Sequence, residues 1–122
     1  MMLYFFVAFG GAVGAVLRYL GMTLAGHVLG VGFPYGTLLV NIAGSFLMGV
    51  LAGVGATIPM THETRAFFAV GLLGGFTTFS AFSLDIVTLY ENGQGAAALL
   101  YALASVALAV LALFVGIFLA RA

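Results

Sequence analysis

The chain has 122 residues, of which 65% are hydrophobic and 5% are charged, and its mean hydropathy is +1.32. A soluble domain carries about a quarter of its residues as charged side chains, so this composition excludes a water-exposed surface and predicts an integral membrane protein. Three arginines balance three acidic residues, and the zero net charge gives no electrostatic basis for binding nucleic acid. The sequence has no cysteine, which excludes disulfides and thiol chemistry.

Four apolar stretches are long enough to cross a bilayer as helices, since about 20 residues span a hydrocarbon core of roughly 30 Å. They cover residues 3–25, 35–58, 65–90 and 95–120. No basic segment precedes the first stretch, so we expect a retained span and not a cleaved signal peptide. The sequence predicts an all-α integral membrane protein in which residues 1–122 form one domain of four transmembrane helices.

The connections between these spans are short and contain both histidines. Pro34 and Pro59 delimit the second span, because proline disrupts a helix interior. His27 and His62 fall in the predicted connections, where we expect them at the wetted interface and not as metal ligands. Arg65 and Arg121 would lie on one side of the membrane and Arg18 near the other, which is a weak orientation signal. Such a signal suggests insertion in both directions and an antiparallel assembly.

Glycines recur at a spacing of four residues, which lets helix backbones approach closely in lipid. Contact within one chain and contact between two copies both remain open for each pair. Close packing of this kind leaves no room for an aqueous pore inside a single chain, so transport would need two copies. The pairs are Gly10 with Gly14, Gly49 with Gly53, and Gly71 with Gly75.

The middle of the third span is a poor helix interior. Gly74 and Gly75 are followed by Phe76 and by the β-branched Thr77 and Thr78, a combination of low helix propensity. We therefore expect the third helix to be broken at its centre, with the freed backbone groups buried in protein or facing a cavity or ion. The alternative is a continuous helix in which threonine and serine bond to their own turn.

Uncharged polar and aromatic side chains lie within the predicted spans. Asn41 must find a hydrogen-bond partner, either as a link between helices or as a donor to a permeating ion. Phe79 and Phe82 share one helix face, where they serve packing or turn their positive ring edges toward an anion. In the fourth span Tyr101 and Ser105 form a stripe at four-residue spacing, which Ala109 continues.

The charged residues of the spans lie near their ends. Arg18 and Asp85 can be simple interfacial residues, or they can pair with each other. No carboxylate lies deep in a span, which argues against a proton-coupled cation transporter. Uncharged donors suit a small, strongly hydrated anion that must shed water without being trapped by a fixed cation.

Three segments together closely resemble the CrcB/Fluc family of fluoride ion channels. They are GAVGAVLRY at 11–19, GTLLVN at 36–41 followed by Gly44, and GGFTTFSAFS at 74–83. The likeness covers all four spans, and the third-span segment is its most specific part. It implies passive export of fluoride from the cytoplasm across the inner (plasma) membrane by an antiparallel, dual-topology homodimer with two pores.

The resemblance also implies roles for particular residues. A structural sodium ion at the dimer centre would be bound by the backbone carbonyls of Gly74 and Thr77. Arg18 would stand in the pore vestibule. Fluoride, membrane lipid and a second copy of the chain are the implied partners. The implied pore residues are Asn41, Phe79, Phe82, Tyr101 and Ser105.

Two positions depart from the family pattern, and two other functions remain open. Ala81 stands where threonine is frequent, and Ala109 replaces a second serine, which shortens the polar track; Asp85 stands where a member can carry glutamate. A small multidrug transporter would be expected to carry a carboxylate in its first span, and residues 3–17 contain none. A structural assembly subunit would give Asn41, Phe79 and Phe82 no specific role. No nucleophile–base pair or phosphate loop supports an enzyme.

Overall fold

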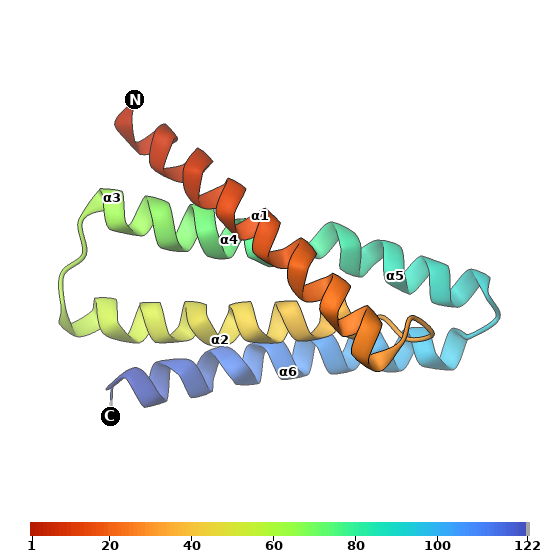
Figure 1. Cartoon of the computed structure of the whole chain (residues 1–122). Coiled ribbons are helices and arrows are strands. Elements are labelled where there is room, and N and C mark those ends of the chain that lie inside the picture. Colours follow the sequence, from red (N-terminus) through yellow and green to blue (C-terminus); the bar gives the residue numbers. More distant parts are fainter. Residues whose placement is uncertain (122) are drawn as a thin grey trace.

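The computed structural model describes residues 1–121, which form helices joined by short connections (Figure 1). Each of the four predicted spans is present as a helical segment that is long and apolar enough to cross a membrane. The prediction of an all-helical, multi-pass membrane protein is confirmed. The observed segments are Met2–Leu29, Tyr35–Thr57, His62–Glu91 and Gly95–Arg121.

The first helix is longer than predicted, and the predicted placement of both histidines in connections is wrong. Helix α1 (Met2–Leu29) ends at Gly30, whose φ of +87° suits glycine, so His27 lies in the last helical turn. Nothing between residue 25 and Gly30 stops the helix. His62 is the first residue of the short helix α3 (His62–Arg65), whose start is capped by the Thr61 hydroxyl.

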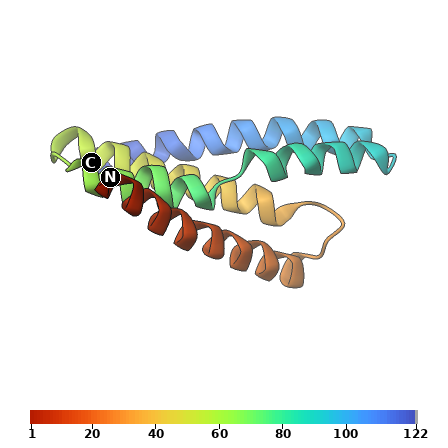
Figure 2. The same cartoon turned by 90° about the horizontal axis from the view of Figure 1, so that it is seen from above.

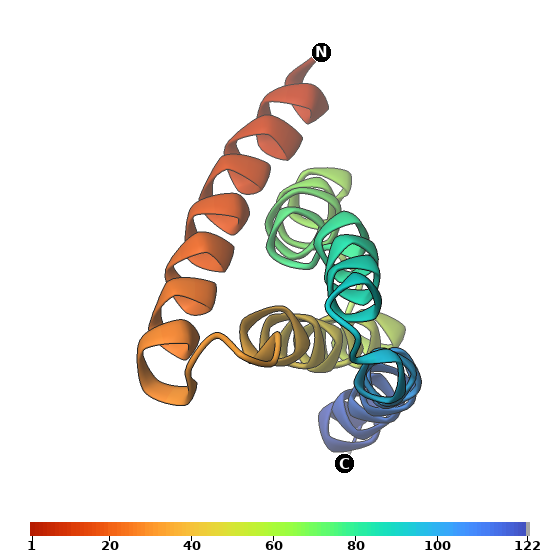
Figure 3. The same ribbon diagram turned by 90° about the vertical axis from the view of Figure 1, so that its right-hand side faces the viewer.

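The four spans alternate in direction. Helices α2 (Tyr35–Thr57) and α6 (Gly95–Arg121) run one way, while α1 and the third span run the other, so both chain ends lie at one end of the bundle (Figures 1 and 2). Viewed along the bundle, α1 flanks α2 and the third span, and α6 lies beside α2 and α5 (Figure 3). The connection between α2 and the third span lies at the same end of the bundle as the two chain ends (Figure 1).

Helices α2 and α6 pack with their backbones in contact. A Cβ added at Gly49 would lie 2.1 Å from the carbonyl oxygen of Leu113, and one at Gly116 would lie 2.3 Å from that of Phe46. A Cβ at Gly53 would lie 2.7 Å from the Cβ of Ala120 and 2.9 Å from the carbonyl oxygen of Ile117. Close approach of this kind replaces the hydrophobic effect as the source of helix association in lipid.

Helix α1 packs in the same way on the first half of the third span. A Cβ at Gly14 would lie 2.1 Å from the carbonyl oxygen of Leu72, and one at Gly75 would lie 2.7 Å from that of Gly11. All three predicted glycine pairs are thus used for packing inside one chain. The pairs on α1 and on the third span face each other.

The third span is made of four helical pieces. They are α3, the π-helix η1 (Ala66–Leu73), α4 (Gly74–Phe76) and α5 (Phe79–Glu91). Between α4 and α5, Thr77 (φ −86°, ψ 156°) and Thr78 (φ −149°, ψ 121°) have extended backbones. Figure 2 shows this extended segment between the green and the teal helices. It lies in the glycine- and threonine-rich part of the span.

Candidate functional site

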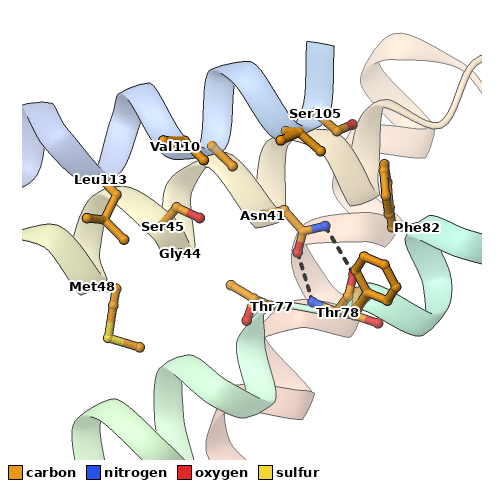
Figure 4. Close-up of a pocket in the computed structure, with 13 residues that line it drawn as sticks. Asn41, Gly44, Ser45, Met48, Thr77, Thr78, Phe82, Ser105, Val110 and Leu113 are labelled. Atoms are coloured by element: carbon orange, nitrogen blue, oxygen red, sulfur yellow. Dashed lines mark hydrogen bonds between the residues drawn. The ribbon is translucent and has the colours of Figure 1, made fainter. Parts of the chain in front are cut away.

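A cavity of about 370 Å³ lies beside the extended residues of the third span (Figure 4). Helix α2, residues 77–82 and helix α6 form its walls. Four of the five predicted pore residues line it, and Tyr101 does not. Its polar lining residues are Asn41, Ser45, Thr77, Thr78 and Ser105, and the remainder are Gly44, Met48, Phe79, Phe82, Val106, Ala109, Val110 and Leu113.

Asn41 binds the backbone of Thr78 through both ends of its amide. Its Nδ2–H donates to the carbonyl oxygen of Thr78 (3.1 Å), and Thr78 N–H donates to its Oδ1 (2.8 Å; dashed lines in Figure 4). The amide therefore pairs with the extended backbone as a neighbouring β-strand would. This contact makes Asn41 a link between helices, and the second N–H of the amide is a further donor at the cavity.

Side chains take over several hydrogen bonds that a continuous helix would make at this point. Thr78 N–H, which would return to the carbonyl of Gly74, instead donates to Asn41. Ala81 N–H, which would return to the carbonyl of Thr77, instead donates to the hydroxyl of Thr78 (3.1 Å). The carbonyl oxygens of Gly74 and Thr77 are thus released from their usual helical donors.

The two predicted pore phenylalanines have unequal environments. Their ring centroids are 5.5 Å apart, and both line the cavity. Phe82 is 8% exposed and packs on Tyr101, with ring centroids 5.3 Å apart, whereas Phe79 is 77% exposed. Phe82 is therefore part of the core of the chain, and Phe79 projects from it.

The hydroxyls of the α6 stripe also differ. Tyr101 is fully buried and its hydroxyl donates to Oδ2 of Asp85 (2.9 Å). Ser105 is 6% exposed, and its Oγ has no hydrogen-bond partner within residues 1–121. A buried hydroxyl without a partner is unfavourable, so Ser105 is the cavity side chain most in need of a ligand or water.

Arg18 reaches the backbone at the end of α4. Its Nε–H donates to the carbonyl oxygen of Gly75 (3.1 Å), while Asp85 accepts from Tyr101. The possible pairing of Arg18 with Asp85 is therefore wrong, and no ion pair forms within the described residues. Each charge is instead balanced by a polar group of another helix.

The sequence of the chain, which includes the residues of this site, matches a known family. A family model described as "CrcB-like protein, Camphor Resistance (CrcB)" matches residues 5–117. The chain belongs to the CrcB family. Relatives named "Fluoride-specific ion channel FluC" are 56% identical over 116 residues in Chelativorans sp. and 53% identical over 116 residues in Rhodospirillum centenum. A third, from Rhodopseudomonas palustris, is 48% identical over 122 residues.

These matches span nearly the whole chain. The alignments cover 94%, 94% and 99% of this protein and 93%, 92% and 98% of the respective relatives. All three relatives carry the name of an ion channel and none that of an enzyme, in agreement with the prediction for this chain. The resemblance to the CrcB/Fluc family, inferred from its motifs, is confirmed.

A second cavity of this CrcB-family chain was not predicted. It measures about 250 Å³ and lies at the end of the bundle formed by the α1–α2 and α5–α6 connections. Thr37 and Asp85 line it, although Thr37 shares a helix with Asn41. Thr37 precedes Asn41 by four residues, so the two cavities lie about one helical turn apart along α2.

Proposed function

We propose that this protein is a fluoride-selective channel through which fluoride leaves the cytoplasm passively across the inner membrane. The names of its relatives support fluoride as the permeating ion, and the cavity supports passive conduction. Fluoride enters a cell as neutral HF, ionises and is trapped, so a passive anion leak is sufficient to lower its concentration. The observation that carries the proposal is the buried, unpartnered hydroxyl of Ser105 in a cavity that also holds Asn41 and Phe82.

The chemistry of the cavity suits a small anion. Its donors include the free amide N–H of Asn41 and the hydroxyls of Ser45 and Ser105, and its aromatic rings can offer positive edges. No arginine or lysine lines it, so an anion meets no fixed cation that would hold it in place. Weak, multiple contacts are what conduction requires, because the ion must both enter and leave.

We further propose that the conducting form is an antiparallel, dual-topology homodimer with two pores. Two observations support it. The cavity is open on one side, and Phe79 projects from its rim with 77% of its surface exposed. The three glycine pairs are consumed inside the chain, so a partner must use another surface, and the exposed side of the third span is available. In this proposal the third helix is broken at Thr77 and Thr78.

We also propose a structural sodium ion, for which the carbonyl oxygens of Gly74 and Thr77 are suitable ligands. The N–H groups that would donate to the carbonyls of Gly74 and Thr77 in a continuous helix donate to side-chain oxygens instead. The carbonyl of Gly75, which lies between them in sequence, accepts from Arg18. Carbonyl oxygens of unwound helices are the usual ligands of sodium in membrane proteins. Gly74 and Thr77 of two copies would hold this structural ion at the dimer centre.

Liposome efflux tests the function directly. The purified protein is reconstituted, and fluoride release is followed with an ion-selective electrode, with chloride release as the paired control. We expect rapid fluoride release and negligible chloride release. A folded, dimeric preparation that releases neither ion would overturn the proposal and favour an assembly subunit. Helix α1 carries no carboxylate, whereas a small multidrug transporter would be expected to have one in its first span.

A further inference from the structure

One face of α1 carries Gly10, Gly14 and Arg18 at four-residue spacing. The two glycines bring the backbone of α1 into contact with η1 and α4, since a Cβ at Gly14 would collide with the carbonyl of Leu72. Arg18 follows one turn later on the same face and therefore meets the end of α4. The arginine is placed there by helix packing and is only partly buried.

The group that Arg18 contacts is an orphan created by the extended segment. In a continuous helix Phe79 N–H would donate to the carbonyl of Gly75; here Nε–H of Arg18 donates to it instead. A carbonyl at membrane depth needs a donor from within the protein. A guanidinium also suits the negative end of the helix formed by α3, η1 and α4.

Asn41 acts on the adjacent helical bond from the other side. It accepts from Thr78 N–H, which would otherwise return to Gly74. Two side chains, 57 and 37 residues distant from their partners, therefore replace two successive bonds, 78→74 and 79→75, among those that would join α4 to α5. Together they favour the extended segment over a continuous helix.

We infer that Arg18 is a positioning residue that caps the carbonyl of Gly75 and thereby keeps Thr77 and Thr78 extended. It acts through the N–H donor at the Nε position and not through attraction of the anion by its charge. The efflux part of its test rests on the proposed fluoride channel, and the spectroscopic part does not. The vestibule role of Arg18 is the competing prediction, because that role depends on charge.

Three substitutions separate donor from charge. Arg18→Gln removes the charge but places an amide nitrogen the same number of bonds from Cα as Nε. Arg18→Lys keeps the charge but places a methylene at that position. Arg18→Met removes both donor and charge at similar length. If Arg18 acts as a cap, glutamine is the conservative replacement; if it attracts the anion, lysine is.

The Gly75 carbonyl can be observed without reference to transport. Gly–Phe pairs occur twice in the sequence, at 32–33 and 75–76. Labelling glycine with ¹³C at the carbonyl and phenylalanine with ¹⁵N therefore gives two signals in an NMR experiment that correlates the two nuclei. The Gly32 carbonyl lies in the α1–α2 connection and serves as the internal reference for the shift of Gly75.

We expect the Gly75 carbonyl shift to stay near the wild-type value in Arg18→Gln and to move in Arg18→Lys and Arg18→Met. Fluoride efflux should follow the same order, with a loss of about tenfold or more where the donor is missing, as for a lost hydrogen bond to a charged group. Any result in which Arg18→Gln does not track the wild type more closely than Arg18→Lys in the Gly75 shift overturns the inference. Wild-type protein without fluoride efflux would instead contradict the proposed function alone.

Discussion

The glycine contacts and the extended segment of the third span are held together by different physics. Where α1 and α2 meet their neighbours, backbones touch because small residues permit it, and no side-chain hydrogen bond is needed. At Thr77 and Thr78 the backbone has left the helix, and side chains from α1 and α2 must satisfy it. The glycine contacts depend on residues that have no side chain, and the extended segment depends on specific hydrogen-bond donors and acceptors.

This difference teaches how a small membrane protein keeps an irregular backbone. Rigid contacts without polar groups fix the positions of α1 and α2, and only then can Arg18 and Asn41 reach the third span. The cavity is built on the second region, at a point where polar groups are already concentrated. Packing and site are therefore coupled, since a displaced α1 would withdraw the donor of Arg18.

The largest effect is expected from Gly14→Ala. A methyl group there would lie 2.1 Å from the carbonyl oxygen of Leu72, and a backbone atom cannot yield as a flexible side chain can. We expect a loss of at least about 3 kcal/mol in the free energy of unfolding, above the usual cost of overpacking. Thermal melting in detergent measures it.

Gly11→Ala is the matched control on the same helix. Its added methyl group would lie 3.9 Å from the carbonyl oxygen of Gly71, which is ordinary van der Waals contact. Melting should stay within a few degrees of the wild type, because alanine is also the better helix former. Equal melting temperatures for the two variants would contradict the view that backbone contact holds α1 in place.

The second effect concerns the extended segment itself. Asn41→Ala removes both hydrogen bonds to Thr78 and leaves a backbone N–H and a carbonyl unpaired in a partly buried site. We expect a loss of roughly 2–6 kcal/mol in stability, at about 1–3 kcal/mol for each of the two unpaired groups. Fluoride efflux from liposomes should fall by at least about tenfold, because the cavity loses both its wall and a donor.

Thr57→Ala is the control for Asn41→Ala. Thr57 is a polar residue of the same helix whose hydroxyl bonds only its own turn, to the carbonyl of Val54 (3.3 Å). Its removal should leave efflux and melting unchanged. Wild-type efflux in a folded Asn41→Ala protein would remove this residue from the proposed pore.

The sequence supports the architecture well and the polar contacts poorly. Span positions follow from apolar length and from proline, and the glycine pairs follow from their spacing, because these signals act along one helix. The hydrogen bond from Arg18 to Gly75 links residues 57 apart, and no local pattern predicts it. The π-helix at residues 66–73 and the bond from Tyr101 to Asp85 were missed for the same reason, since both depend on how helices meet.

The third effect separates packing from function within the cavity. Phe82→Ile removes a ring that is 8% exposed and packed on Tyr101, so we expect a loss of about 1–2 kcal/mol in stability together with reduced efflux. Phe79→Ile changes a ring that is 77% exposed in the single chain, and it should leave the fold of that chain unchanged within about 0.5 kcal/mol.

The two variants therefore distinguish efflux lost through a less stable fold from efflux lost through a direct role of the ring. If Phe79→Ile abolishes efflux while its melting matches the wild type, the ring acts on the ion or on a partner. Efflux that falls only in proportion to stability in both variants would assign the two rings to packing. Melting and efflux measured on the same preparation give the comparison.

The smallest effect on stability and the most informative one on function is expected from Ser105→Ala. The hydroxyl is buried and has no partner within the described residues, so its removal eliminates an unfavourable group without breaking a hydrogen bond. The free energy of unfolding should stay the same or rise slightly. Fluoride efflux should nevertheless fall, because the cavity loses one of its donors. Ser83→Ala, which changes a serine outside that cavity, should leave efflux unchanged. A Ser105→Ala protein with full efflux would mean that the unpaired hydroxyl serves no ion.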